Sequence, residues 1–338
     1  MAELSILDLV RVREGFTPRH ALDNARDLAA HAEDWGYRRF WVAEHHNMQG
    51  IASAATAVVI AHIAAGTERI RVGAGGIMLP NHAPLVIAEQ FGTLAQLFPG
   101  RIDLGVGRAP GTDQMTMRAL RRSLTNADNF PQDVQELEAY LAPAQPGQTL
   151  FAVPATGTQV PLWILGSSTY GAQLAAALGL PYAFASHFAP ADLLPALEIY
   201  RERFKPSDVL QKPYAMAALN VIAAETDAEA RRLATTQQMS VADIFRGARG
   251  LSKPPIDDIE DYWTPMEKAQ AQRFLARSVI GGPERVREGI AAFVRETGVD
   301  EVIVVSDVFD HDKRLASYRM IAEVAGALAG TQAEAAAV

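Results

Sequence analysis

The sequence predicts a (β/α)8 TIM barrel, an α/β fold, with an insertion after its seventh βα unit. Strand-like and helix-like segments alternate along all 338 residues, and eight strand segments are each followed by a helical one. The strand segments are continuous apolar runs, which is typical of a parallel sheet buried on both faces. Eight such units in one chain favour a closed barrel over an open, doubly wound sheet. Because such barrels commonly exceed about 250 residues as one domain, we expect one domain over residues 1–330 and a flexible tail over 331–338.

The first half of the chain supplies four βα units. Proline near the start of a helical pattern and glycine at its end mark the boundaries, as Pro18 and Gly36 do for the first helix. A short insertion, 109–130, follows the fourth strand. Strands are expected at 4–10, 38–45, 69–78 and 101–108, and helices at 18–35, 54–65, 84–97 and 131–142.

The second half repeats the alternation and contains one long irregular segment, 241–282, after the seventh unit. A long insertion in a compact domain is usually a lid or a functional loop, although a surface excursion without function fits the pattern equally well. As a lid, the segment would offer Tyr262 and Trp263 as covers. Strands are expected at 161–168, 181–188, 214–225 and 300–308, and helices at 169–179, 190–203, 227–240, 283–297 and after the last strand.

The composition excludes several classes of function. The chain has 31 basic and 39 acidic residues, a formal net charge of −8 and no Lys/Arg run, so we expect no nucleic-acid or membrane partner. It has no cysteine, which excludes disulfides, thiolate nucleophiles and cysteine-ligated metals. No apolar run approaches the roughly 18 residues of a membrane span, and the N-terminus lacks the basic region of a signal peptide. We therefore expect a cytoplasmic protein.

Unusual polar residues gather where the strands are expected to end, which is where barrel enzymes carry their active sites. The stretch VAEHHN, residues 42–47, ends the second strand. Neighbouring strand residues point to opposite faces. His45 therefore shares a face with Trp41, whereas His46 shares the other face with Val42, a residue that suits the helix-packed outside. This pattern makes His45 the candidate acid/base and His46 a residue that lines the pocket or braces it.

Three further strand ends suggest a ligand site. The glycines of GAGG (73–76) indicate either a close approach by a ligand or packing against a helix. Arg108 suits a phosphate or carboxylate, although a lone arginine is usually structural, for instance in a salt bridge to Asp113. The turn at Gly166–Ser168 opens a helix whose free N–H groups suit phosphate, although N-capping by a serine explains it as well. With Arg108 on the adjacent strand, phosphate is the better interpretation.

Asn81, His82 and His187 also lie in loops that follow strands, where they become candidates for the pocket. A histidine in such a loop is, taken alone, more often structural than catalytic. No metal site is predicted, because neither an H-x-H nor an H-E-x-x-H motif occurs. The P-loop and the G-x-S-x-G nucleophile elbow are absent too.

Several stretches together resemble the bacterial luciferase-like flavin monooxygenases over about residues 4–325. The resemblance favours a branch other than the light-emitting subunits. The stretches are SILDLV, WVAEHHN, RIRVGAGGIMLPNHAPLVIAEQFGTLAQLFPGRIDLGVGRAPGTD, GSSTYGAQLAAALGLPYAFASHF and VIGGPERVREGIAAFVRETGVDEVIV. The resemblance implies a homodimeric α/β barrel that uses reduced FMN, supplied by a separate flavin reductase. Dioxygen adds to the reduced flavin, and the resulting C4a-peroxyflavin attacks a small organic substrate such as an aldehyde or ketone.

Carried over position by position, the resemblance implies roles for particular residues. His45 matches the active-site histidine, and the Ala74–Gly75 bond matches a non-prolyl cis peptide beneath the flavin ring. Arg108 matches a ligand of the FMN phosphate, and Gly166, Ser167 and Ser168 match the phosphate loop. The chain departs from the light-emitting subunit at Gly171, where that subunit has a hydroxyl side chain. One phosphate contact is therefore lost or moves to Thr169 or Tyr170.

Three rival functions stay open at this point. A deazaflavin-dependent oxidoreductase on the same barrel would transfer hydride without oxygen, but the GRAPGTD stretch differs from the loop typical of that branch. A flavin-sequestering or storage protein would bind the cofactor without catalysis, and His45 argues weakly against it. A barrel that binds a sugar phosphate lacks an obvious lysine or paired carboxylates at the strand ends.

Overall fold

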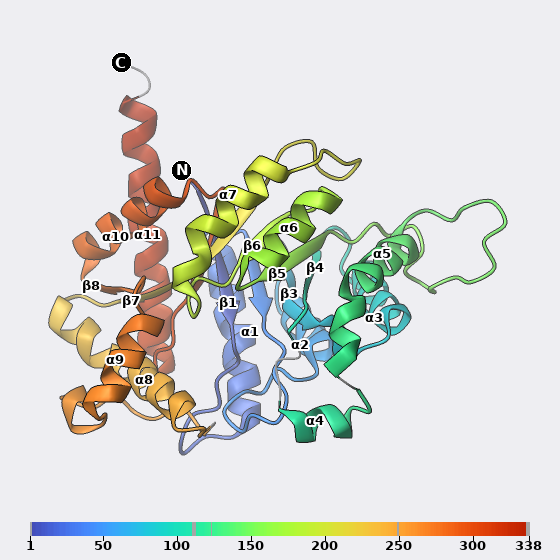
Figure 1. The fold of residues 1–338 in the computed structure, drawn as a ribbon. Helices are drawn as coiled ribbons and strands as arrows, with labels where there is room; N and C mark the ends of the chain where they lie inside the picture. Colours follow the sequence, from blue (N-terminus) through green and yellow to red (C-terminus); the bar gives the residue numbers. More distant parts are fainter. Residues whose placement is uncertain (1, 110–112, 123, 249, 336–338) are drawn as a thin grey trace.

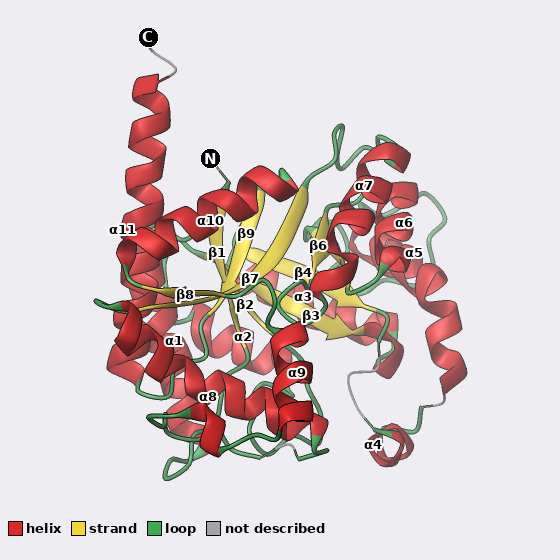
Figure 2. Ribbon diagram, turned by 60° about the vertical axis from the view of Figure 1, so that its left-hand side comes forward, coloured by secondary structure: helices red, strands yellow, loops and turns green. Residues whose placement is uncertain are grey.

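A computed structural model describes residues 2–109, 113–122, 124–248 and 250–335. Within these residues eight parallel strands close into a barrel in the order β6-β5-β4-β3-β2-β1-β9-β7, with β6 pairing back to β7. Helices surround the strands, which confirms the predicted TIM barrel (Figure 2). The barrel strands are β1 Glu3–Asp8, β2 Arg39–Val42, β3 Arg71–Met78, β4 Ile102–Gly107, β5 Leu162–Gly166, β6 Tyr182–Phe184, β7 Ala215–Ala223 and β9 Glu301–Val305.

The helices follow the strands as the pattern predicts. The last of them projects past the barrel (Figure 1) and continues through Ala335, within the segment for which we expected a tail. No helix in the described part of the chain is long and apolar enough to cross a membrane. The helices are α1 Pro18–Asp34, α2 Thr56–Ala64, α3 Pro84–Leu97, α4 Gln114–Ala119, α5 Phe130–Leu141, α6 Thr169–Leu178, α7 Leu193–Arg203, α8 Asp227–Phe245, α9 Pro265–Phe274, α10 Pro283–Thr297 and α11 His311–Ala335.

Both insertions contain structure that the pattern did not predict. Helix α4 lies in 109–130, and α9 together with the short strand β8 (Val279–Gly281) lies in 241–282. β8 pairs with the end of β7, where Val279 lies opposite Val221. A strand of three residues is too short to show a hydrophobic period in the sequence. Its pairing with β7 and the helices packed on it stabilise it instead. Figure 1 shows α9 and α4 on opposite sides of one end of the barrel.

Side chains alternate between two apolar layers along the strands. Phe40 and Val42 lie in the outer layer, between the barrel and its helices. Trp41 and Ala43 lie in the inner layer, together with residues such as Trp163. The facing predicted for the second strand is therefore confirmed up to Ala43, and His45 continues the inner series.

The start of the second insertion is held against the barrel loops by backbone hydrogen bonds. The loop after β1 lies between two other segments. The amide N–H of Val12 donates to the Gly50 carbonyl at 3.0 Å, and the Ser252 N–H donates to the Val12 carbonyl at 2.9 Å. The Glu14 N–H donates back to the Ser252 carbonyl at 2.9 Å. These bonds place residues 250–253 of the insertion at the rim of the barrel.

Candidate functional site

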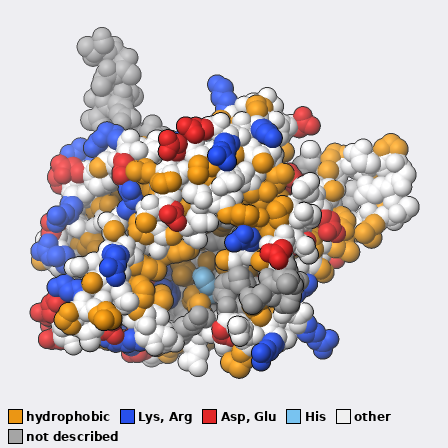
Figure 3. Space-filling view, viewed as in Figure 1, with side chains coloured by type: hydrophobic (Ala, Val, Ile, Leu, Met, Phe, Trp, Pro, Cys, Tyr) orange, Lys and Arg blue, Asp and Glu red, His pale blue; other side chains and the backbone are white. Residues whose placement is uncertain are grey.

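A cavity of about 720 Å³ opens at the carboxyl ends of the strands, a volume typical of small-molecule sites. Figure 3 shows this face as a hollow bordered largely by hydrophobic side chains, with a histidine visible inside it. Seven residues predicted for the site line the cavity. They are His45, Gly75, Arg108, Gly166, Ser167, Ser168 and His187. Segments more than 100 residues apart in the chain therefore meet around one space, as the barrel prediction requires.

The cis peptide lies one residue later than predicted. It joins Gly75 to Gly76 rather than Ala74 to Gly75. The prediction for Ala74 is wrong in a second respect, because its side chain is fully buried in the outer apolar layer and does not line the cavity. The β3–β4 register shifts between Gly75 and Ile77, so the backbone of both glycines faces the cavity instead.

Neither glycine of that bond has room for a side chain. A Cβ atom on Gly75 would lie 2.7 Å from Leu7 Cδ1, inside the barrel. A Cβ atom on Gly76 would lie 2.7 Å from the Gly105 carbonyl oxygen. The close approach of β4 therefore requires glycine at Gly76, whereas a side chain at Gly75 would displace Leu7 and Trp41 inside the barrel. The bare backbone of both glycines forms part of the cavity wall.

Arg108 and the start of α6 form a cationic corner of the cavity. The Arg108 guanidinium carbon lies 4.1 Å from the centre of the Tyr170 ring, which holds it beside the first turn of α6. Among the described residues no carboxylate lies within ion-pair distance of it. Asp113, the alternative partner, instead caps α4 by accepting from the Thr116 N–H at 2.8 Å. Arg108 is thus an exposed cation that faces the cavity.

The serines at this corner are not used as plain helix caps. Ser168 is the N-cap residue of α6, and its hydroxyl makes no capping hydrogen bond to the helix. The helix therefore presents its first N–H groups, its positive dipole end and a serine hydroxyl to the cavity. Gly171 lies against the strand end, because a Cβ there would be 3.2 Å from the Gly166 Cα atom. Close packing of α6 on β5 accounts for the absence of a hydroxyl side chain at this position.

A second polar group faces His45 across the cavity. Burial lowers the pKa of His187 to about 3, and the nearby His45 contributes to the same shift. The imidazole of His187 therefore stays neutral near pH 7. The His187 carbonyl accepts from Asn220 Nδ2 at 2.7 Å, and Asn220 Oδ1 accepts from Gln237 Nε2 at 2.8 Å. Asn220 and Gln237 line the cavity and were missed by the sequence analysis. An asparagine inside the apolar run AALNVIAA was a signal that could have revealed the first of them.

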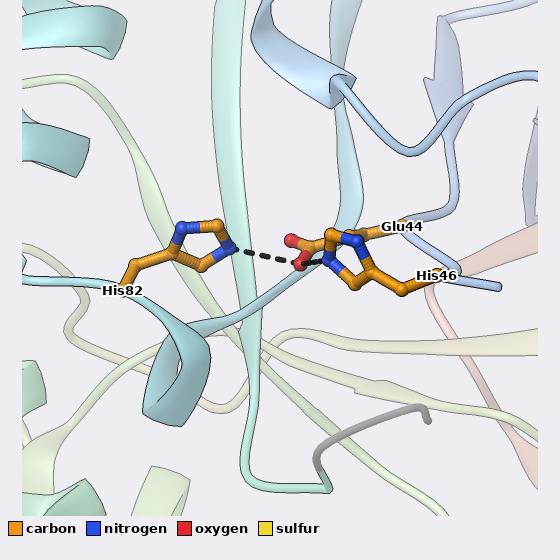
Figure 4. A group of neighbouring side chains, drawn as sticks. All are labelled: Glu44, His46 and His82. Atoms are coloured by element: carbon orange, nitrogen blue, oxygen red, sulfur yellow. Dashed lines mark hydrogen bonds and ion pairs between the residues drawn. The ribbon is translucent and has the colours of Figure 1, made fainter. Parts of the chain in front are cut away.

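Asn81 and His82 do not line the cavity, against their prediction as pocket residues. His46 does not line it either, which leaves the second alternative given for it, that it braces the pocket. His46 and His82 instead converge on the carboxylate of Glu44, outside the barrel wall (Figure 4). Asn81 belongs to a short 3-10 helix, Leu79–Asn81, that follows β3. Glu44 and His46 lie just after β2 and do not line the cavity, and the loop after β3 brings His82 to the same carboxylate.

The three side chains around Glu44 also form a potential metal-ligand set. One ligand atom of each of Glu44, His46 and His82 lies within 4.8 Å of the others. The imidazoles, however, already contact one carboxylate oxygen at 2.6 and 2.8 Å. Nitrogen and oxygen ligands at about 2.0–2.2 Å from a tetrahedral zinc are farther apart than that. The arrangement therefore satisfies the buried carboxylate by hydrogen bonding.

The second insertion forms one wall of the cavity, although not through the predicted covers. Val241, Ile244 and Phe274 line the cavity, whereas Tyr262 and Trp263 do not. The Tyr262 hydroxyl donates to Asp243 Oδ1 at 2.6 Å and accepts from Lys253 at 2.5 Å. This polar network holds Tyr262 behind the wall and braces the segment that carries it.

These features fit a flavin mononucleotide. Arg108, Ser168 and the α6 N-terminus offer donors and positive charge to a phosphate. The Gly75–Gly76 backbone and the inner apolar layer offer a surface on which a planar ring can lie. His45 and His187 reach the same space. The donor set is thus arranged for a ligand with an anionic end and a flat, largely apolar body.

Comparison with known proteins agrees with this geometry. The family model described as luciferase-like monooxygenase matches residues 2–301. A luciferase-like monooxygenase of Escherichia coli K12 is 50% identical, covering 96% of this chain and 98% of its own. The crystal structure of apo-MsnO8 superposes with a TM-score of 0.85 at 36% identity and covers 96% of this chain and 98% of its own.

More distant structures share the fold with different cofactors. A type II Baeyer-Villiger monooxygenase from Pseudomonas putida in complex with FMN has a TM-score of 0.72 at 18% identity, with 95% and 97% of the chains covered. An F420-dependent secondary alcohol dehydrogenase has a TM-score of 0.68 at 15% identity, with 96% and 98% covered. At such identities the likeness extends to the fold alone. The match of the family model over most of the chain and the 50% identity show that the chain belongs to the luciferase-like monooxygenase family.

Proposed function

We propose that this oxidoreductase uses reduced FMN and dioxygen to oxidise a small, largely apolar organic substrate. The observation that carries the proposal is the cationic corner of Arg108 and the uncapped start of α6, which opens into the same cavity as His45 and the Gly75–Gly76 backbone. A separate flavin reductase would supply the reduced cofactor. When bound, reduced FMN supplies the reaction with dioxygen.

The protein's part in the reaction is to bind, to orient and to handle protons. Arg108 and Ser168 would hold the anionic end of the cofactor, and the glycine backbone beside His45 would support its flat part. The imidazole of His45 is placed to transfer a proton between the cavity and the bound reactants, and imidazoles titrate near neutral pH. His187 stays neutral and serves as a hydrogen-bond partner. The apolar wall of Val241, Ile244 and Phe274 limits the access of water.

Anaerobic titration with photoreduced FMN tests the proposal. We expect saturable binding, then substrate-dependent consumption of oxygen when air is admitted with a panel of aldehydes, ketones and thioethers. Reduced riboflavin and reduced F420 serve as matched ligands. A preference for F420 with hydride transfer and no oxygen uptake would favour the deazaflavin alternative. Tight FMN binding without turnover of any substrate would favour a storage protein.

A further inference from the structure

We infer that Glu44 is a positioning residue: its buried carboxylate joins the end of β2 to the end of β3 and thereby sets His45 against the Gly75–Gly76 backbone. The inference rests on the proposed function for its consequence in catalysis, but its structural content can be tested without any flavin. Figure 4 shows the side chains that carry it.

The carboxylate of Glu44 has a partner for each oxygen. Its side chain is 1% exposed. Oε1 accepts from Nε2 of His46 at 2.6 Å and from Nε2 of His82 at 2.8 Å. Oε2 accepts from the Met78 backbone N–H at 3.0 Å. Three donors from two loops and one strand thus converge on a single buried side chain.

These contacts span the irregular part of β3. The Glu44 backbone N–H donates to the Gly76 carbonyl at 3.4 Å, and the Glu44 side chain accepts from the Met78 N–H. The β3–β4 register shifts between Gly75 and Ile77, so Gly76 lies at the irregularity and Met78 lies just beyond it. Glu44 therefore bonds to the irregular residue of β3 with its backbone and to the regular strand beyond it with its side chain. The glycine backbone that lines the cavity is held from behind by this residue.

His45 is fixed by the same contacts because it lies between two of the bonded residues. Glu44 and His46 point away from the cavity and are joined to each other at 2.6 Å. His45, the residue between them, lines the cavity. A change at Glu44 would consequently reach His45 through the backbone, without removing any group from the cavity wall.

The electrostatics favour an ionised Glu44 in this place. Burial would raise its pKa, but hydrogen bonds from His46 and His82 and from the Met78 N–H outweigh it and lower the pKa to about 2. The hydrogen bond to Glu44 raises the pKa of His46 in turn. Among the described residues no lysine or arginine pairs with this carboxylate. The two imidazoles and the Met78 amide therefore stabilise the buried, ionised carboxylate.

The cluster is also tied to the insertion that follows Arg108. Asn47 Nδ2 donates to Asp113 Oδ2 at 2.9 Å, and Arg122 Nε donates to the Asn81 carbonyl at 3.2 Å. Both bonds join residues next to the cluster with the segment 113–122. Glu44 thus lies where the loops after β2, β3 and β4 are connected, behind a cavity that the loops after β2 and β4 line.

Glu44→Gln tests the inference, because it keeps the shape of the side chain but presents an amide N–H₂ where a donor already lies. In the flavin-free protein, NMR should show a lower His46 pKa and shifted amide resonances at Gly76 and Met78. With flavin, substrate turnover should fall about 10- to 100-fold, the loss expected from displacing a reacting group by a fraction of an ångström to 1 Å. The yield of free hydrogen peroxide should rise.

Glu33→Gln is a matched control at the opposite end of β3. The Glu33 side chain is 8% exposed and also accepts three backbone N–H bonds, from Glu68, Arg69 and Ile70. We expect it to lower thermal stability as much as Glu44→Gln does, with normal turnover and an unshifted Gly76 resonance. His82→Asn, which removes one donor, should move turnover and peroxide yield in the same direction as Glu44→Gln, by less.

Two outcomes would overturn the inference. Equal effects of Glu44→Gln and Glu33→Gln on turnover and peroxide yield would show that Glu44 contributes stability alone. Stoichiometric binding of Zn²⁺ by the wild type, lost in Glu44→Gln, would show that the three side chains hold a metal instead. A wild type that binds no reduced FMN would instead reject the proposed function, and the NMR comparison would still decide whether Glu44 connects the two strands.

Discussion

The charged residues at the two ends of the barrel interior differ in how they are paired. At the amino end, Arg39 is buried between Asp103 and Glu301, with nitrogen–oxygen distances of 2.7 Å to each. At the carboxyl end, Arg108 is exposed and has no carboxylate partner among the described residues. The first arginine is paired within the protein, whereas the second is available to an anionic ligand. The carboxyl end has a paired arginine too, Arg314 with Asp8 at 2.8 Å, so the unpaired Arg108 is what distinguishes this end.

At the closed, amino end of the barrel, Asp103 and Arg39 each have more than one stabilising contact. Arg71 also pairs with Asp103 at 2.5 Å, and Trp41 Nε1 donates to the same carboxylate at 3.2 Å. The Arg39 guanidinium lies 4.8 Å from the centre of the Trp163 ring. Burial lowers the pKa of Arg39, but the two carboxylates outweigh it and raise the pKa above its usual value. In this network each charged side chain has a partner of opposite charge.

The largest expected effect is at the open end. Replacing His45 with asparagine should lower turnover by about 10²- to 10⁴-fold, the range for loss of a general acid/base. Stability against urea should change by less than about 1 kcal/mol, because the side chain faces the cavity. Steady-state oxygen consumption and urea unfolding measure the two effects. A variant with normal turnover would remove His45 from the mechanism.

The next largest effect is expected at the closed end, on stability and not on the binding of the cofactor. Arg39→Met leaves Glu301 and Asp103 with fewer partners in the interior, which should cost about 3–5 kcal/mol in the free energy of unfolding. Affinity for reduced FMN should be unchanged under conditions where the variant is folded. Arg38→Met is the control, because Arg38 pairs with Glu3 at the surface and such pairs contribute less than about 1 kcal/mol. Similar losses in the two variants would argue against the buried network.

A smaller effect tests the unpaired arginine. Arg108→Ala should weaken binding of reduced FMN about 10- to 100-fold, as expected for loss of a charge-assisted contact. Binding of riboflavin, which has no phosphate, should barely change. Arg101→Ala, at the opposite end of the same strand, is the control, since Arg101 donates to the Ala64 carbonyl away from the cavity. Equal weakening for both ligands would reject a phosphate role for Arg108.

The smallest effect concerns pH. The pKa of His187 is lowered to about 3 from an ordinary value of 6.5. Between these values the unfolded chain binds more protons at this site than the folded one, so stability falls as the pH drops from 6.5 toward 3. His187→Asn should reduce this loss and leave stability at pH 7.5 nearly unchanged. Urea unfolding at pH 7.5 and pH 5 measures the difference, and parallel curves for both proteins would contradict it.

Local pattern in the sequence was sufficient for the barrel and for half of the site. Continuous apolar strands repeated eight times leave few folds that can bury them all. Strand alternation separated His45 from His46, because two neighbours in an extended chain cannot face the same side. Arg108 and Ser168 were found because each follows a strand directly, and the barrel brings all such ends to one face.

Contacts between distant segments settled the remaining questions. Which residues form the cavity wall depends on the register of β3 against β4, which shifts between Gly75 and Ile77 and leaves Gly75 and Gly76 at the cavity. His82 lies far from Glu44 in sequence and meets it only because β2 and β3 are adjacent. The side chains of 241–282 that face the cavity are chosen by how α8 and α9 pack on the rim. Such choices are made by three-dimensional neighbours, which a pattern along the chain does not contain.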